Sequence, residues 1–263
     1  MPPSTVAAPR SAGRLPDVVV IGAMKCGTSA LHSYLDAHPD IAMAPVKELN
    51  FFTGPEQAPH DDPSTWWRDG QWHRGVGWYA GQLDLDARLC GESSPGYTSP
   101  DEPHVARRMA SVVPAVRLVY LVRDPVERAL SQYAHHRRDG TEHRPMAEAL
   151  LDPGSQYLSR SRYHERLVPF LRRFRRSQVH VVVAERLLAR RVPEMARVYA
   201  HVGADPTWTG QALGELVHVA EQRYDAPPAL RAEVWDRVGD DVRLLRELLD
   251  DAVDEWSPMP PRR

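Results

Sequence analysis

The sequence has little lysine and little cysteine, and it carries no excess of charge of one sign. Of its 33 basic residues only two, Lys25 and Lys47, are lysine. The formal net charge of −2 argues against a broad nucleic-acid-binding surface, so a site for an anion must be local. Two cysteines, Cys26 and Cys90, are too few for a disulfide framework, which favours a reducing cytoplasm.

Long apolar runs are also missing. The longest is about as long as a buried strand, far below the roughly 20 residues that cross a bilayer, so we expect no membrane partner. Residues 1–15 lack the apolar core of a secretory signal. The 263 residues, 42% of them hydrophobic, instead fit one globular domain. We expect this domain over 16–256, with disordered tails at 1–15 and 257–263.

Short apolar runs alternate with helical patterns along the chain. This alternation predicts an α/β fold with a central parallel sheet and helices on both faces. Ligands of such sheets bind beyond the carboxyl ends of the strands. The expected strands are 17–22, 41–44, 87–90, 117–122 and 179–184; the expected helices are one that ends before Pro39 and those at 103–112, 125–138, 161–174, 192–201 and 227–251.

The segment 53–82 interrupts this alternation and holds four of the seven tryptophans. A loop of this length inside a domain is often a lid or the wall of a binding site. We interpret Trp78 as core packing. The other three, Trp66, Trp67 and Trp72, are candidates to line a substrate site.

A phosphate-binding loop is predicted where the first strand ends. The segment Gly22–Ser29 leads from a buried strand into a helix, so its backbone N–H groups and the helix N-terminus face an anion. The side chains of Lys25, Thr28 and Ser29 add donors. In a Walker A motif the lysine follows the second glycine, whereas Lys25 precedes Gly27, which disfavours an ordinary ATPase or kinase. An incidental turn capped by Thr28 is the alternative.

A second phosphate site is predicted where the strand 117–122 ends. Arg123 lies at the carboxyl edge of the sheet, and Ser131 follows about two helical turns later. An arginine and a hydroxyl so placed can hold a second phosphate if the helix packs beside the first loop. Alternatively, Asp124 and Pro125 are only a helix start and Arg123 forms a surface ion pair.

These segments resemble motifs of the sulfotransferases that use 3′-phosphoadenosine 5′-phosphosulfate. Gly22–Leu31 is similar to their 5′-phosphosulfate loop, and Arg123–Ser131 is similar to their 3′-phosphate motif. The resemblance is closest to the branch that contains the Golgi heparan sulfate sulfotransferases and many bacterial enzymes, and it implies a P-loop-like fold. It spans most of residues 17–251, because further segments match in order: Lys47–Phe52, Gly91–Tyr97, 161–174 and 178–185.

The resemblance also implies roles for single residues, and it requires no metal. Glu48 would be the catalytic base, and Lys25 would bind the 5′-phosphosulfate near its bridging oxygen. The implied donor-binding residues are Lys25, Cys26, Gly27, Thr28, Ser29, Arg123, Ser131 and Arg223, and the implied acceptor-binding residues are Lys47, Asn50, Ser93 and Tyr97. Trp66, Trp67 and Trp72 are added as acceptor-site candidates from the tryptophan-rich segment, not from the resemblance.

Two positions depart from the pattern of the heparan enzymes, which commonly carry histidine where this chain has Asn50 and lysine where it has Ser93. Both departures favour a smaller or less anionic acceptor. The sequence thus predicts transfer of a sulfuryl group from the nucleotide donor to a hydroxyl, or secondarily an amine, of a small molecule or glycan. His104 is the next candidate base, and we interpret five histidines as helix-surface residues: His32, His38, His104, His135 and His136.

Two other functions remain as alternatives. One is a P-loop nucleotide-dependent phosphotransferase, in which Asp124 would hold magnesium. The other is a non-catalytic nucleotide-binding protein that docks a partner on its tryptophan-rich segment. Retention of both Lys25 and Glu48 weighs against this second alternative.

Overall fold

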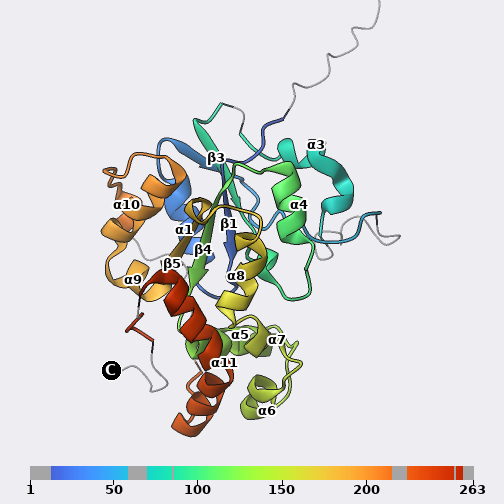
Figure 1. Cartoon of the computed structure of the whole chain (residues 1–263), viewed down its shortest axis with the longest axis vertical. Coiled ribbons are helices and arrows are strands. Elements are labelled where there is room, and N and C mark those ends of the chain that lie inside the picture. Colours follow the sequence, from blue (N-terminus) through green and yellow to red (C-terminus); the bar gives the residue numbers. More distant parts are fainter. Residues whose placement is uncertain (1–12, 59–69, 85, 215–223, 252, 257–263) are drawn as a thin grey trace, which may run out of the picture.

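Five strands form one parallel sheet in the computed structural model, which describes residues 13–58, 70–84, 86–214, 224–251 and 253–256. Their order is β2-β3-β1-β4-β5, so β1 lies in the centre between β3 and β4 (Figure 1). The predicted parallel sheet is confirmed. The strands are β1 (Val18–Gly22), β2 (Ile41–Met43), β3 (Leu89–Ser93), β4 (Arg117–Val122) and β5 (Val179–Val183).

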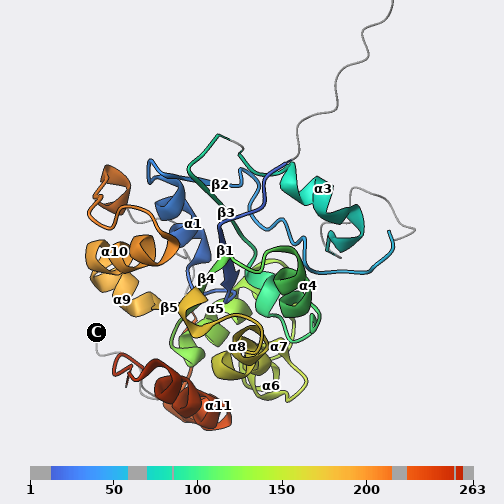
Figure 2. The ribbon, with the colours of Figure 1, turned by 45° about the horizontal axis from the view of Figure 1, so that its top comes forward.

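Helices cover both faces of the sheet, as predicted. One face carries α1, α9 and α10, and the other carries α4 and α8 (Figure 2). This layering buries β1 and β4 on both sides, which explains why their sequences are continuous β-branched and apolar runs. The bounds are α1 (Thr28–Asp36), α4 (Val105–Val112), α8 (Tyr163–Leu171), α9 (Ala184–Ala189) and α10 (Arg191–Val202).

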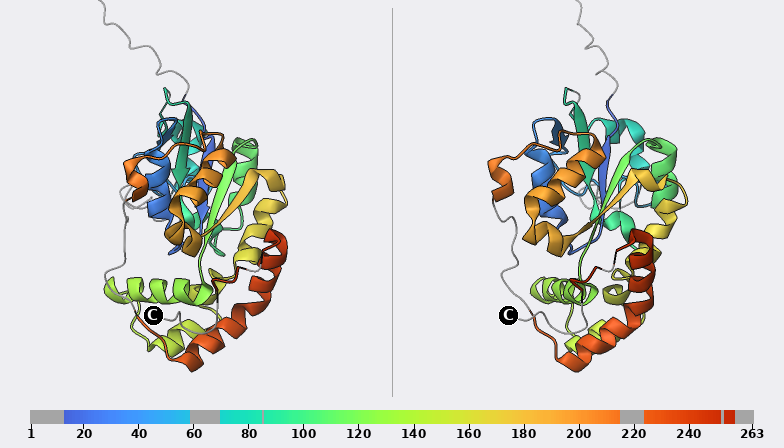
Figure 3. Two further views of the ribbon diagram at one scale, coloured as in Figure 1. Left: turned by 90° about the vertical axis from the view of Figure 1, so that its left-hand side faces the viewer. Right: turned by 60° about the vertical axis from the view of Figure 1, so that its left-hand side comes forward.

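A third group of helices lies beyond the carboxyl ends of the strands. Figures 1 and 3 show α5 crossing below the arrowheads, with the long α11 packed along the same side. These helices wall the edge of the sheet at which ligands of parallel sheets bind. They are α5 (Pro125–Arg138), α6 (Met146–Leu151), α7 (Gln156–Ser159) and α11 (Pro228–Leu249).

Most predicted elements are present, and their differences have local causes. The strand expected at 87–90 runs instead over Leu89–Ser93. Its last residues, including the polar Glu92 and Ser93, are buried, which an apolar pattern could not predict. Short elements carried no clear periodicity and were not predicted. Besides α6, α7 and α9, they are α3 (Gly75–Ala80), η2 (Trp72–Arg74), η3 (Pro95–Thr98), η4 (Arg176–Gln178) and η5 (Gln211–Gly214).

Among the described residues, no helix is both long and apolar enough to cross a membrane. The predicted tails at 1–15 and 257–263 lie largely outside the described residues, so the domain boundaries stay predictions.

Candidate active site

The first predicted phosphate loop connects β1 to α1 and bends sharply. Lys25 and Gly27 both have positive φ, 68° and 98°. Gly27 is the N-cap of α1 and offers no side chain to it, so N–H groups of the first helical turn can donate to an anion. Thr28 is buried and Ser29 is half-buried at this helix start. The loop therefore has the geometry of an anion site.

Lys25 stands among other cations. Burial lowers the pKa of its ammonium group, and the positive charge of Arg138 lowers it further, while Asp139 opposes them. Arg123 lowers this pKa as well. An anion placed beside Lys25 would relieve the repulsion between these charges, so the cluster favours binding of a negatively charged group.

The second predicted phosphate segment touches the first. The Nη1 atom of Arg123 donates to the carbonyl oxygen of Lys25 at 3.4 Å, across 98 residues of sequence. Asp124 caps α5 by accepting from the N–H groups of Val126 at 2.9 Å and Glu127 at 3.0 Å. The predicted helix start is thus present, and it also directs Arg123 toward the loop.

Arg123 takes part in an arginine–glutamate–arginine cluster. One carboxylate oxygen of Glu127 lies 3.6 Å from Arg123, and the other accepts from Arg231 at 2.6 Å. The Arg231 side chain, from the first turn of α11, is only 2% exposed. One carboxylate therefore faces two guanidinium groups, and a second carboxylate, that of Asp225, lies 3.7 Å from Arg231.

Glu48 lies on the loop after β2, at the carboxyl edge of the sheet. Its N–H donates to the carbonyl oxygen of Ser93 at 2.9 Å, and its side chain pairs with Lys47 at 3.0 Å. The Glu48 side chain remains 46% exposed. The backbone N–H of Phe51 bonds to the Tyr97 hydroxyl at 3.0 Å, which fixes the loop to the core. Glu48 thus reaches solvent from a rigid support.

Two predicted acceptor residues lie under this loop. The Ser93 side chain is fully buried, and its hydroxyl lies 3.0 Å from Nδ1 of His32. Tyr97 is also buried, where it supports the loop. Asn50 has a φ of 48°, and its N–H bonds to the Ser94 hydroxyl at 3.0 Å. Their contacts with an acceptor stay predictions.

Glu92 is a buried carboxyl group to which sequence reasoning assigned no role. It accepts hydrogen bonds from the hydroxyls of Tyr79 at 3.1 Å and Ser94 at 2.7 Å. Burial raises its pKa to about 7, although these hydrogen bonds oppose the shift. The carboxyl group of Glu92 is therefore placed to hold the end of β3 and the Glu48 loop together.

The Cys26 thiol faces the protein interior. Its Sγ atom lies 3.6 Å from the Tyr163 hydroxyl, and burial raises the pKa of the thiol to about 11. Only the backbone of Cys26 is therefore available to a donor phosphate. Ser131, on α5, is half-buried.

The aromatic segment is described only in part. The indole N–H of Trp72 donates to Glu56 at 2.8 Å, and its ring packs 5.3 Å from the ring of Phe51. Trp72 therefore borders the Glu48 loop. The predicted residues Trp66, Trp67 and Arg223 lie outside the described residues.

The last turns of α5 bring in residues that sequence reasoning missed. His135 is half-buried, with a third of its side chain exposed: burial lowers its pKa, and the positive charge of Lys25 lowers it further. The guanidinium of Arg138 lies 2.6 Å from Nδ1 of His135, and the carboxylate of Asp139 lies 3.2 Å from its Nε2. Only the crossing of α5 over the sheet edge reveals this placement. His38, also predicted on a helix surface, is 1% exposed.

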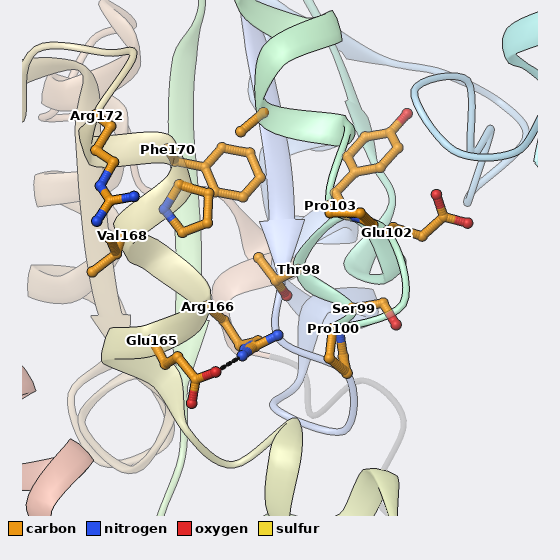
Figure 4. Close-up of a pocket in the computed structure, with 13 residues that line it drawn as sticks. Thr98, Ser99, Pro100, Glu102, Pro103, Glu165, Arg166, Val168, Phe170 and Arg172 are labelled. Atoms are coloured by element: carbon orange, nitrogen blue, oxygen red, sulfur yellow. Dashed lines mark hydrogen bonds and ion pairs between the residues drawn. The ribbon is translucent and has the colours of Figure 1, made fainter. Parts of the chain in front are cut away.

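A cavity of about 290 Å³ lies elsewhere, between η3 and α8 (Figure 4). Among the predicted site residues that the structure describes, Tyr97 alone lines it. Its wall mixes apolar groups such as Phe170 with charged groups such as Arg166 and Glu165. Because Lys25, Glu48 and Arg123 are absent from this wall, we place the site at the polar edge of the sheet. In the described ranges no three His, Cys, Asp or Glu side chains gather as metal ligands.

Comparisons with known proteins show the family to which the chain is related. The model of the sulfotransferase family matches residues 47–209. The chain is 32% identical to heparan sulfate glucosamine 3-O-sulfotransferase 6 of Mus musculus over 200 residues, covering 72% of this chain and 53% of the relative. It is 29% identical to the mouse 3-O-sulfotransferase 3A1 over 200 residues, covering 72% and 46%. It thus spans about half the length of these curated relatives.

A solved sulfotransferase from Alicyclobacillus acidocaldarius has the same fold. The two structures superpose with a TM-score of 0.76 at 26% identity, covering 92% of this chain and 99% of the other. The family match covers more than half of the chain and includes Glu48, the Gly91–Tyr97 segment and Arg123. The chain therefore belongs to the sulfotransferase family.

Proposed function

We propose that the protein transfers a sulfuryl group from 3′-phosphoadenosine 5′-phosphosulfate to a hydroxyl of a glycan or small-molecule acceptor. The observation that carries the proposal is the contact between the two phosphate segments, in which Arg123 bonds to the backbone of Lys25 at 3.4 Å. Two adjacent anion sites suit a nucleotide with phosphates at both its 5′ and 3′ positions. Family membership supports the sulfuryl chemistry.

The residues suggest a division of labour in this reaction. The acceptor oxygen attacks sulfur, and the bond between sulfur and the bridging oxygen breaks in line with it. Glu48 takes the acceptor proton, since its side chain is exposed at the carboxyl edge of the sheet, the edge at which the donor would bind. Lys25 and the start of α1 stabilise the charge that collects on the departing phosphate.

The acceptor class rests on the relatives and on two residues. The mouse relatives are named as 3-O-sulfotransferases of heparan sulfate glucosamine, which supports a hydroxyl acceptor and keeps an amine as the second class. Asn50 and Ser93 replace charged or ionisable groups of the heparan enzymes, and Ser93 is buried here. We therefore favour an acceptor smaller or less anionic than heparan sulfate.

A magnesium-dependent phosphotransferase is less well supported. The Asp124 carboxylate, its candidate metal ligand, caps α5 through two backbone hydrogen bonds. Calorimetry separates the two functions. Adenosine 3′,5′-bisphosphate should bind without magnesium and at least tenfold more tightly than 5′-AMP or ATP. Equal affinity for 5′-AMP, or a strict need for magnesium, would contradict the proposed donor.

A further inference from the structure

The segment Val253–Trp256, which we call the C-terminal latch, packs against the domain after α11 ends. Val253 is fully buried and Trp256 is 3% exposed. A single tryptophan beyond the last long helix has no periodicity to mark it, so its burial is a finding of the structure. The indole N–H of Trp256 connects to one phosphate segment, and the Trp256 ring connects to the other.

The indole N–H of Trp256 connects the latch to the second phosphate segment. It donates to Oε2 of Glu185 at 3.0 Å. The other oxygen of Glu185 accepts from the backbone N–H of Asp124 at 2.9 Å. Asp124 caps α5 and directly follows Arg123. One carboxylate therefore joins Trp256 to the start of the helix that carries Ser131.

The ring of Trp256 connects the latch to the first phosphate loop. It packs against the ring of Tyr163, with the centroids 5.8 Å apart. The Tyr163 hydroxyl lies 3.6 Å from Sγ of Cys26, between Lys25 and Gly27. Movement of Trp256 would thus loosen the packing beneath the loop that faces the 5′ end of the donor.

Ion pairs and backbone contacts hold the latch in place. Arg186 pairs with Asp251 and, at 2.7 Å, with Glu255, and this arginine is largely buried. Arg246 donates to the carbonyl oxygens of Val253 at 3.3 Å and Trp256 at 3.4 Å. These contacts fix the segment at both of its ends.

We infer that the C-terminal latch positions both phosphate segments for the donor, and that Trp256 is a positioning residue. The inference rests on the proposed function. Trp256 acts through Glu185 and Tyr163, and none of its described contacts is with Lys25, Glu48 or Arg123. Its removal should weaken donor binding and leave acceptor binding unchanged, because the Glu48 loop is fixed independently to the end of β3.

The substitution Trp256→Phe tests this inference, because it keeps a ring against Tyr163 and removes the N–H that bonds to Glu185. We expect the Kd of adenosine 3′,5′-bisphosphate, measured by calorimetry, to rise about 3- to 30-fold, the scale of coupling through a positioning residue. The KM of the donor should rise with it, and the KM of the acceptor should not change. Trp208→Phe is the matched control, since Trp208 packs on His38 and Tyr199.

Two further variants keep the inference falsifiable if Trp256→Phe unfolds. Glu185→Gln should raise the same Kd, and combining it with Trp256→Phe should add little, because both substitutions break one connection. Arg186→Met should loosen the latch from outside and act in the same direction. An unchanged Kd in folded variants, or equal rises in the donor and acceptor KM, would overturn the inference that the C-terminal latch positions the phosphate segments. Failure of the wild-type protein to bind the bisphosphate would instead overturn the proposed function.

Discussion

Replacing Glu48 by glutamine separates chemistry from structure at the candidate site. Glutamine has the same shape but cannot take a proton at neutral pH. The loop should keep its position, because it is held by its own backbone N–H groups: that of Glu48 donates to the carbonyl oxygen of Ser93, and that of Phe51 donates to the Tyr97 hydroxyl. The substitution also breaks the ion pair between Glu48 and Lys47, but this pair is exposed and contributes little to stability.

The expected effect is therefore confined to turnover. Loss of a general base lowers the rate by about 10²- to 10⁴-fold, equivalent to about 3–5 kcal/mol in the activation barrier. A radiolabelled-donor assay gives the turnover, and calorimetry with adenosine 3′,5′-bisphosphate gives the donor affinity, which should stay within about twofold of the wild-type value. The thermal midpoint should not change.

The control is Lys47→Met, which breaks the same ion pair and leaves the carboxylate in place. Because Lys47 is itself an expected acceptor-binding residue, this variant can raise the KM of the acceptor, but it should retain most of the turnover at saturating acceptor if the acid–base role of Glu48 is what matters. Near-normal turnover of Glu48→Gln at saturating acceptor would refute the reasoning. His135 would then be the next base to test instead of His104, because His135 lies beside Lys25 and His104 lies at the start of α4.

Two further predictions concern charge. Lys25→Ala should lower turnover by about 10²- to 10³-fold and should weaken binding of the bisphosphate, because it removes a preorganised hydrogen-bond donor to the departing phosphate. Full activity in a folded variant would contradict any role of Lys25 in the reaction. Burial raises the pKa of Glu92 to about 7, above its usual 4.5, so the native protein holds this proton more tightly than the unfolded chain does. The stability that the protonated Glu92 contributes is therefore full below pH 4.5 and is lost as the pH rises through 7. Thermal unfolding should show that the stability of Glu92→Gln relative to the wild type grows from pH 5 to pH 8, toward a limit on the order of 3 kcal/mol. A difference in stability that does not depend on pH would contradict a raised pKa of Glu92.

Sequence patterns predicted the elements whose causes are local. The strand Arg117–Val122 and the helix Pro125–Arg138 were predicted at their observed bounds, because a buried run ends in an Asp-Pro helix start. The shift of β3 has another cause. The sequence Gly91–Ser93 is typical of a turn, but it is the buried end of β3. Hydrogen bonds from Tyr79 and Ser94 compensate the burial of Glu92, and a hydropathy pattern cannot predict such bonds.

The parts of the candidate site were predicted less evenly than the strands. Lys25, Glu48 and Arg123 lie at the expected edge, because each follows the end of a parallel strand. The neighbourhood of His135, Arg231 and Trp256 was missed, since it depends on how α5 and α11 cross that edge. Such crossings arise from tertiary packing, and no local periodicity encodes them.

The fixing of the Glu48 loop has a consequence for how this protein can change. The loop is tied to residues after β3, while the donor segments are tied to each other and to α5. The proposed base is therefore fixed through residues after β3 and the proposed donor segments through α5, with a direct link between the two supports, from Ser93 to His32 of α1. Exchange of the exposed residues beside Glu48, with Glu48 kept, should change which acceptor binds and leave the affinity for the proposed nucleotide donor unchanged. This loop is therefore the place at which to engineer a different sulfated product.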